Sequence, residues 1–256
     1  LLPFPGREEN ADSHYSYIKR LAEECTAIKS AASQSMYPCV NAVIKSIEEF
    51  KEKDISLKTL AARLHVSPSY LGTVFKQQTG YYFNDYLTEA RIRYAAKLIE
   101  KGDFVFLDAG TTTEKMIDHL TVRDVTFVTN GFIHAKKLAV KGYKVFITGG
   151  EIKASTEAIV GAECVLTLKN YNFTKCFMGT NGISLTAGFT TPDVNEAKVK
   201  AAAIESSREV YVLADHSKFD EVSSATFAGL GKAVIITDMI PNRKYKEAAD
   251  ITEVGQ

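Results

Sequence analysis

Six short apolar runs alternate with helical stretches between residues 104 and 238, and this alternation constrains the fold more than any other feature. The runs are rich in β-branched and aromatic residues, and each ends in Gly, Asn or Asp. They read FVFLDAG, VTFVTN, KVFITGG, CFMGTNG, VYVLAD and AVIITD, with TEKMIDHL, FIHAKKLAV and VNEAKVKAAAIESS between them. Strands that alternate with helices predict a parallel, doubly wound α/β sheet, in which ligands bind at the carboxyl ends of the strands.

The chain before residue 102 has a helical texture instead. An apolar stripe over 13–34 predicts a helix, and its shortness favours packing on its own domain over a dimerising coiled coil. A second helix is expected over 38–51. Ser56 is a candidate N-cap for a helix over 57–64. Ser67 caps the next helix, with Pro68 at its first position, Gly80 ends it, and an unbroken helix is predicted over 84–101.

Composition sets broad limits on the class of protein. A chain of 256 residues with 45% hydrophobic and 24% charged residues predicts one or two soluble domains. No apolar run approaches the length of a membrane helix, and no signal peptide is recognised, so we expect a cytoplasmic protein. The four cysteines are scattered and indicate reduced thiols rather than a disulfide frame or a zinc site. We expect no metal and no cofactor. The cysteines are Cys25, Cys39, Cys164 and Cys176.

Positive charge is concentrated in one segment, although the formal net charge is zero. Residues 55–99 carry six basic and two acidic residues, a balance of +4. Such a segment is typical of a surface that contacts DNA phosphates, although a solvated face would give the same count. The basic residues are Lys58, Arg63, Lys76, Arg91, Arg93 and Lys97, and the acidic ones are Asp85 and Glu89.

The same segment holds the apolar skeleton of a helix-turn-helix, in which one helix braces a second against the major groove. The apolar positions are Leu57, Leu60, Ala61, Leu64, Val66, Leu71, Val74 and Phe75. The outward positions left over are polar or small, and hydroxyl, amide and ammonium groups can reach bases or phosphates. These positions are Ser69, Tyr70, Gly72, Thr73, Lys76 and Gln77.

Residues 37–99 resemble the first helix-turn-helix of AraC-type transcription regulators, through LAARLHVSPSYLGTVFKQQTGYYFNDYLTEARIRYAAKLI. The resemblance implies base-facing positions at Ser69, Gly72 and Thr73. It implies DNA contacts by Arg63, Ser67, Ser69, Tyr70, Thr73, Lys76 and Gln77, with Tyr81 a further candidate for the DNA backbone. The second motif of the AraC pattern does not occur here, and one motif has a small footprint, so we expect a homo-oligomer. A helix-turn-helix that makes only protein contacts remains the alternative.

A loop after the first predicted strand has the chemistry of an anion site. Gly110 permits a tight turn, and Thr111, Thr112 and Thr113 offer hydroxyls and amides at a helix start. Strand–Gly–Thr–helix is also ordinary turn chemistry. Glu196 and Lys200 are four residues apart on one helix face, where the lysine could meet a phosphate or form a surface salt bridge with the glutamate.

From about Arg93 to Ile251 the chain resembles the effector domain of DeoR-type repressors. The signature is FLDAGTTT, VTFVTNG, ITGGEI, IVGAEC, KCFMGTNGIS, GFTTPDVNEAKVK and VLADHSKF, in that order. The resemblance implies a fold similar to sugar-phosphate isomerases and a phosphorylated-sugar effector. Gram-positive fructose-operon repressors are the most similar, which implies fructose 1-phosphate. The implied effector-binding residues are Asp108, Gly110, Thr111, Thr112, Thr113, Asn130, Gly149, Gly150, Gly179, Asn181, Gly182, Glu196, Lys200, Asp215 and Lys218.

The two resemblances meet in the helix predicted over 84–101. We therefore expect an N-terminal helical segment at 1–36, an all-α helix-turn-helix domain at 37–99 and an α/β doubly wound effector domain at 100–256. The predicted function is a DNA-binding transcription regulator, a repressor of sugar metabolism controlled by a phosphorylated sugar. A natural fusion, an engineered chimera and a composite of two chains all fit the sequence, and in a chimera the halves could be uncoupled.

The remaining alternative is a sugar-phosphate isomerase or deaminase, with Glu196 as base and Asp108 or Asp215 as acid. Isomerase chemistry needs a carboxylate-rich loop after the GTNG strand, and GISLTAG holds no carboxylate. The sequence therefore favours a regulator over an enzyme.

Overall fold

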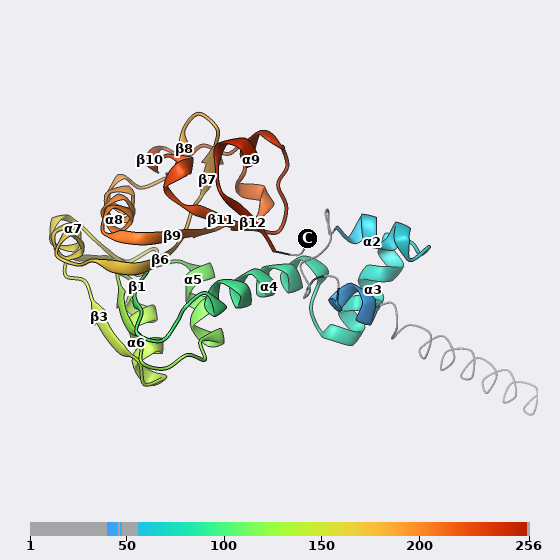
Figure 1. Cartoon of the computed structure of the whole chain (residues 1–256), viewed down its shortest axis with the longest axis horizontal. Coiled ribbons are helices and arrows are strands. Elements are labelled where there is room, and N and C mark those ends of the chain that lie inside the picture. Colours follow the sequence, from blue (N-terminus) through green and yellow to red (C-terminus); the bar gives the residue numbers. More distant parts are fainter. Residues whose placement is uncertain (1–39, 46, 48–55, 255–256) are drawn as a thin grey trace, which may run out of the picture.

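The computed structural model describes residues 40–45, 47 and 56–254. A small helical body and a larger α/β body are joined by the helix α4, Phe83–Lys97 (Figure 1). Of the helix expected over 38–51, residues 40–45 and 47 are helical. The helix expected over 13–34 lies outside the described residues, as do Cys25 and Cys39.

The helical body contains the predicted helix-turn-helix, formed by α2, Leu57–Arg63, and α3, Pro68–Thr79. Both predicted N-caps are confirmed. The Ser56 hydroxyl accepts from the Thr59 N–H at 3.1 Å, and Thr59 Oγ1 accepts from the Ser56 N–H at 3.0 Å, which forms a capping box. Ser67 Oγ accepts from the Tyr70 N–H at 3.2 Å, with Pro68 at the first helical position. Gly80 ends α3 with a φ of 79°, the left-handed conformation that glycine adopts at no steric cost.

Gly72 corrects one expectation about this body. A Cβ added to Gly72 would lie 3.1 Å from Leu57 Cδ2, so this position faces α2 rather than outward. The missing side chain lets the two helices cross closely. The expectation that Gly72 faces bases is therefore wrong. The absence of a side chain at Gly72 does not reduce the groups that the outward face of α3 can offer.

The joining helix ends earlier than the sequence predicted. It stops at Lys97 instead of Lys101, and the N–H groups of Leu98 and Ile99 bond back to Ala95 and Ala96 in a tightened last turn. Asp103 Oδ2 then accepts from the Glu100 N–H at 2.7 Å, and Gly102 turns with a φ of 86°. These contacts direct the chain into the first strand in place of a further helical turn.

The larger body is built on a seven-stranded sheet in the order β12-β11-β9-β6-β1-β2-β3, and all of its neighbouring strands are parallel. The six predicted strands all lie in this sheet, and β12 is an addition that the sequence did not predict. The bounds are β1 Phe104–Leu107, β2 Thr126–Thr129, β3 Lys144–Ile147, β6 Phe173–Gly179, β9 Ser207–Leu213, β11 Val234–Thr237 and β12 Ile251–Glu253.

Helices cover both faces of the sheet, which confirms the doubly wound arrangement. Val105 and Leu107 of β1 pack in one apolar cluster with α4, α5 (Thr111–Met116) and α6 (Phe132–Val140). Phe106 packs on the opposite face with α7 (Ala162–Lys169) and α8 (Val194–Glu205). Successive side chains of a strand point to opposite faces, so a strand covered on both sides is apolar throughout.

Smaller elements surround the sheet, and the sequence did not predict them. A hairpin pairs β4, Glu151–Lys153, with β5, Ala158–Val160, and a three-stranded antiparallel sheet has the order β10-β8-β7. The other bounds are β7 Gly182–Ser184, β8 Gly188–Thr191, β10 Ala225–Ala228, η1 Ile117–His119, η2 His216–Lys218, η3 Leu230–Lys232 and α9 Lys244–Ala248.

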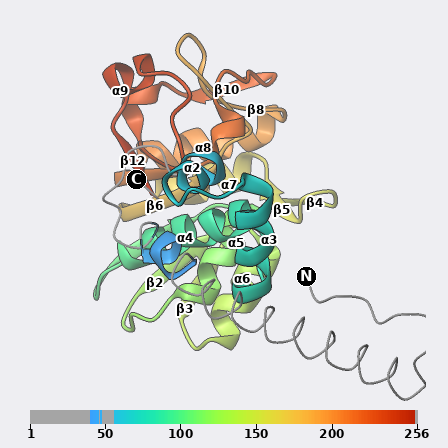
Figure 2. The ribbon, with the colours of Figure 1, turned by 90° about the vertical axis from the view of Figure 1, so that its right-hand side faces the viewer.

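One apolar cluster runs without interruption from the helical body into the sheet. Leu71 and Phe75 of α3 belong to the same cluster as Ile92 of α4 and Phe177 of β6. Figure 2, viewed from the helix-turn-helix end, shows α2 and α3 in front of the sheet. Because α4 buries residues along its whole length, it is a packed connection and not a loose linker. None of the described helices is long and apolar enough to cross a membrane.

Candidate functional site

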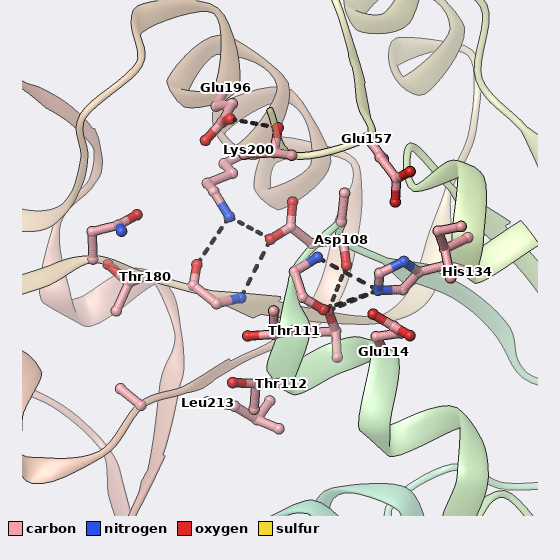
Figure 3. Close-up of a pocket in the computed structure, with 18 of the residues that line it drawn as sticks. Asp108, Thr111, Thr112, Glu114, His134, Glu157, Thr180, Glu196, Lys200 and Leu213 are labelled. Carbon is pink, nitrogen blue, oxygen red and sulfur yellow. Dashed lines mark hydrogen bonds and ion pairs between the residues drawn. The ribbon is translucent and has the colours of Figure 1, made fainter. Parts of the chain in front are cut away.

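The sheet creates a crevice where its strand order reverses. The chain runs outward from β1 through β2 to β3, and then returns to the other side of β1 as β6, β9 and β11. Open parallel sheets bind ligands at this point, beyond the carboxyl ends of the strands. A cavity of about 650 Å³ lies there, lined by the residues that follow β1, β6 and β9 (Figure 3).

The segment after β1 forms one wall of the cavity. The Ala109 N–H donates to Asn130 Oδ1 at 2.9 Å, and Thr113 Oγ1 donates to the Asp108 carbonyl at 2.6 Å. Gly110 has a φ of −179°, which is extended backbone that any residue can adopt, so the expected tight turn at Gly110 is not formed. Thr111 and Thr112 begin α5, and first-turn amides have no intrahelical acceptor.

A buried ion pair joins this wall to the end of β6. Lys200 Nζ of α8 donates to Asp108 Oδ2 in a short contact and to the Gly179 carbonyl at 3.0 Å (Figure 3). The Gly179 N–H in turn donates to Asp108 Oδ2 at 3.3 Å. Asp108 is 2% exposed and Lys200 6% exposed, so each charge depends on the other for compensation.

Glu196 pairs with the β4–β5 hairpin and not with Lys200. Lys153 Nζ donates to Glu196 Oε1 at 2.9 Å and to Asp193 Oδ2 at 3.0 Å. The alternative of a surface salt bridge between Glu196 and Lys200 is therefore wrong. Hydrogen bonds from Glu196 and Asn195 N–H groups and from Lys153 lower the pKa of Asp193, and the two carboxylates raise the pKa of Lys153.

His134 supports the same wall from α6. Its Nε2 lies 3.1 Å from Thr113 Oγ1 and 3.1 Å from the Gly110 carbonyl (Figure 3). Burial lowers the pKa of His134 despite the nearby Asp108 and Glu114 carboxylates, so the ring is neutral at pH 7. A neutral imidazole here positions the loop by hydrogen bonding.

The end of β9 supplies a carboxylate and a lysine. Burial favours the protonated form of Asp215, but the Ser217 hydroxyl and N–H, together with Arg91 and Lys218, outweigh it and lower the pKa of Asp215. Asp215 is therefore ionised at pH 7. Lys218 of η2 is half-buried and lines the cavity beside it.

Eleven of the fifteen effector-binding residues expected from the sequence line this one cavity. They are Asp108, Gly110, Thr111, Thr112, Thr113, Gly179, Asn181, Glu196, Lys200, Asp215 and Lys218. The other four are not on its wall. Asn130 donates to the Ile159 carbonyl and accepts from the Ala109 N–H, so it supports the loop from behind. Gly149 and Gly150 follow the edge strand β3, and Gly182 packs against the Glu221 carbonyl.

The cavity wall also includes residues that the sequence did not indicate as effector-binding, and one of them, Arg91, was counted with the basic segment typical of a DNA-contacting surface. Thr88 and Arg91 reach it from α4, and Lys153 to Glu157 reach it from the hairpin. Arg91 interrupts an apolar stripe formed by Leu87, Ala95 and Leu98, and a charge on an apolar stripe is the signal that could have identified it. The hairpin residues carry no comparable signal. Among the described residues no cluster suited to a metal ion is present.

The expected DNA-binding residues all lie at the surface of the helical body. Lys76 lies over the Tyr82 ring at 3.6 Å, and Thr73 Oγ1 donates to the Ser69 carbonyl at 2.9 Å. α3 therefore presents hydroxyl, phenol, amide and ammonium groups on one exposed face. The seven exposed residues are Arg63, Ser67, Ser69, Tyr70, Thr73, Lys76 and Gln77.

Residues 90–239 match the model of the DeoR C terminal sensor domain. The chain belongs to this family. The match begins inside α4 and ends just after β11, so it includes every strand end that lines the cavity. The helix-turn-helix lies before the matched residues.

Curated relatives are similar over 56–63% of this chain. The HTH-type transcriptional regulator FruR of Bacillus subtilis (strain 168) is 48% identical over 144 residues, covering 56% of this chain and 57% of that protein. IolR of the same organism is 36% identical over 166 residues, covering 63% and 66%. The lactose phosphotransferase system repressor of Staphylococcus aureus (strain N315) is 31% identical, also covering 63% and 66%. The chain thus spans 57–66% of the length of these relatives.

Among solved structures, ribose 5-phosphate isomerase A from Methanocaldococcus jannaschii is similar in fold. The match covers 53% of this chain and 55% of the isomerase chain. It is 18% identical, with a TM-score of 0.38.

Proposed function

We propose that this chain is a DNA-binding transcription regulator of sugar metabolism, a repressor, whose DNA binding is controlled by a phosphorylated sugar in the cavity. The relatives that share its sensor domain are named as regulators or repressors, including a lactose phosphotransferase system repressor. The observation that carries the proposal concerns α4. This helix lines the sensor cavity, and its buried apolar residues belong to the same cluster as those of the helix-turn-helix.

The groups on the cavity wall are suited to bind a phosphorylated sugar. Thr111 and Thr112 offer hydroxyls and first-turn amides to a phosphate, with cations on the surrounding walls. Asn181, Glu196 and Asp215 offer amide and carboxylate groups that can bond sugar hydroxyls. Fructose 1-phosphate is the proposed effector because the sensor part of the sequence resembles gram-positive fructose-operon repressors.

The DNA-reading half is proposed to be an AraC-type helix-turn-helix that places α3 in the major groove. Its seven exposed polar residues would divide between phosphates and base edges. A single module buries only roughly 600–1,000 Å² on DNA, so a homo-oligomer is proposed to give useful specificity.

Catalysis is not part of the proposal. Glu196, the residue that would act as base, is ion-paired to Lys153, and Asp108 is ion-paired to Lys200. Asp215 has a lowered pKa, and a general acid at neutral pH needs a raised one. The wall therefore suits binding better than proton transfer.

The test has two parts. Thermal unfolding is measured with fructose 1-phosphate, fructose 6-phosphate, glucose 6-phosphate and unphosphorylated fructose. A ligand at 100 times its dissociation constant should stabilise the protein by roughly 2.7 kcal/mol. DNA sequences are then selected from a random duplex library. Stabilisation by a sugar phosphate together with an enriched DNA sequence supports the proposal. If no sugar phosphate stabilises the protein, or if no sequence is enriched, the proposal is wrong.

A further inference from the structure

Arg91 places a buried positive charge on the helix that joins the two bodies. The residue is 4% exposed, lies in the middle of α4 and lines the sensor cavity together with Thr88. A charge is costly to bury unless it is paired and hydrogen-bonded. The partners of the guanidinium therefore show which of its donors remain for a ligand.

Three hydrogen bonds hold the guanidinium, and they do not use all of its N–H donors. Nη1 donates to Asp238 Oδ1 at 2.7 Å and to the Ala214 carbonyl at 3.3 Å, and Nη2 donates to Thr88 Oγ1 at 2.8 Å. A guanidinium has five N–H donors. The Nε–H and one Nη2–H therefore have no acceptor among the residues that the structure describes, although the side chain is buried at a cavity wall.

Two other cations of the wall are already paired with carboxylates. Lys200 uses two of its three N–H donors on Asp108 and the Gly179 carbonyl, and its charge compensates the buried Asp108. Lys153 bridges Asp193 and Glu196. Lys218 is only half-buried. Arg91 is the buried cation of this wall that keeps two donors for a ligand.

Asp238 holds the guanidinium in place and leaves some of its N–H donors free. It follows β11 and also accepts from the His216 N–H at 2.8 Å and from His216 Nδ1 at 2.7 Å. The carboxylate is thus shared between Arg91 and the η2 segment. An anionic group in the cavity can bond the free edge of the guanidinium while Asp238 keeps its contact.

We propose that Arg91 binds the anionic group of the effector and joins it directly to the helix that carries the DNA reader. This inference rests on the proposed function and specifies how effector binding is transmitted to the helix-turn-helix. Phe83 and Leu87 of α4 belong to the cluster that includes the core of α3, so an effector held by Arg91 stabilises the docked position of α4. Lys200 then serves to organise the β1 and β6 ends.

The test compares two variants that differ only at residue 91. Removing Arg91 alone would leave the Asp238 carboxylate without its buried cation and could unfold the protein, so the comparison is made in the Asp238→Asn background. Isothermal titration measures affinity for fructose 1-phosphate, fructose 6-phosphate, glucose 6-phosphate and inorganic phosphate. Adding Arg91→Met should weaken binding about 10- to 100-fold, the loss expected for a charged hydrogen-bonding partner. Arg93→Met is the matched control, since Arg93 is on α4 and stacks on Tyr86 away from the cavity wall.

A second readout separates anchoring from general stability. Amide hydrogen exchange over residues 84–97 should slow when the tightest probe binds to the wild type and to Arg93→Met. It should not slow in Arg91→Met/Asp238→Asn at a probe concentration that saturates it. Slowing in that double variant as well would overturn the link to α4.

The outcomes distinguish the inference from the proposed function. If the wild type binds a probe and Arg91→Met in the Asp238→Asn background binds it equally well, the inference is overturned and the proposed function stands. If the wild type binds none of the probes, the proposed function fails, and the inference fails with it.

Discussion

Replacing Lys200 by methionine should destabilise the protein strongly, because it leaves the Asp108 carboxylate buried without its cation. Asp108 is 2% exposed, and apart from Lys200 its carboxylate accepts only the Gly179 N–H at 3.3 Å among the described residues. Breaking a buried pair from one side typically costs about 3–5 kcal/mol. We therefore expect a loss of about 3–5 kcal/mol.

The expected loss of stability is large enough to measure by thermal unfolding. For a chain of this size a loss of about 3–5 kcal/mol lowers the melting temperature by about 6–20 °C. The chain has no tryptophan, so circular dichroism at 222 nm follows the unfolding.

Two further variants decide the cause. Asp108→Asn/Lys200→Met removes both charges and should recover most of the lost stability. Lys198→Met, at an exposed position of the same helix, should change stability by less than about 0.5 kcal/mol. A loss at Lys200 below about 1 kcal/mol, or a double variant as unstable as the single one, would refute the account of a mutually dependent buried pair.

Three other predictions follow from the geometry. Ser56→Ala removes the capping box of α2 and should cost about 1 kcal/mol in urea unfolding; an unchanged midpoint would contradict the role of the cap. Asp193 has a lowered pKa, so its stabilisation is present above the unfolded-state pKa of about 3.9 and is lost as the pH falls through the folded value. Asp193→Asn should therefore flatten the acid limb of a stability profile between pH 6 and pH 2, and an unaltered slope would argue against it. Lys76→Ala should weaken DNA binding across sequences and reduce the salt slope measured by fluorescence anisotropy by about 1, whereas the exposed sensor residue Lys232→Ala should not; equal slopes for both would remove Lys76 from the DNA face.

Local patterns determined the strands and the caps well. The β-branched runs predicted six strands of the parallel sheet because a strand buried on both faces must be apolar throughout. Ser56, Ser67 and Gly80 act within one turn of their own position, so the sequence alone identified them. The hairpin β4–β5 was missed because its strands are three residues long, too short to show a period.

The pairing of charges could not be read from spacing. Glu196 and Lys200 lie at the helical spacing for a salt bridge, yet Lys200 pairs with Asp108, 92 residues away in the sequence. The buried carboxylate gains more from the lysine than the partly exposed glutamate would. Arg91 pairs with Asp238 across 147 residues for the same reason. These contacts exist only once α4, α8 and the strand ends pack together.

The most direct test of the central claim is a reciprocal titration of DNA and effector on the whole chain. The affinity for the selected DNA sequence is measured with and without saturating fructose 1-phosphate, and the affinity for fructose 1-phosphate is measured with and without that DNA. Coupled sites should change each other's affinity by the same factor, typically about 5- to 150-fold. If both ligands bind but neither alters the affinity for the other, the sensor does not control the helix-turn-helix, and the account is wrong.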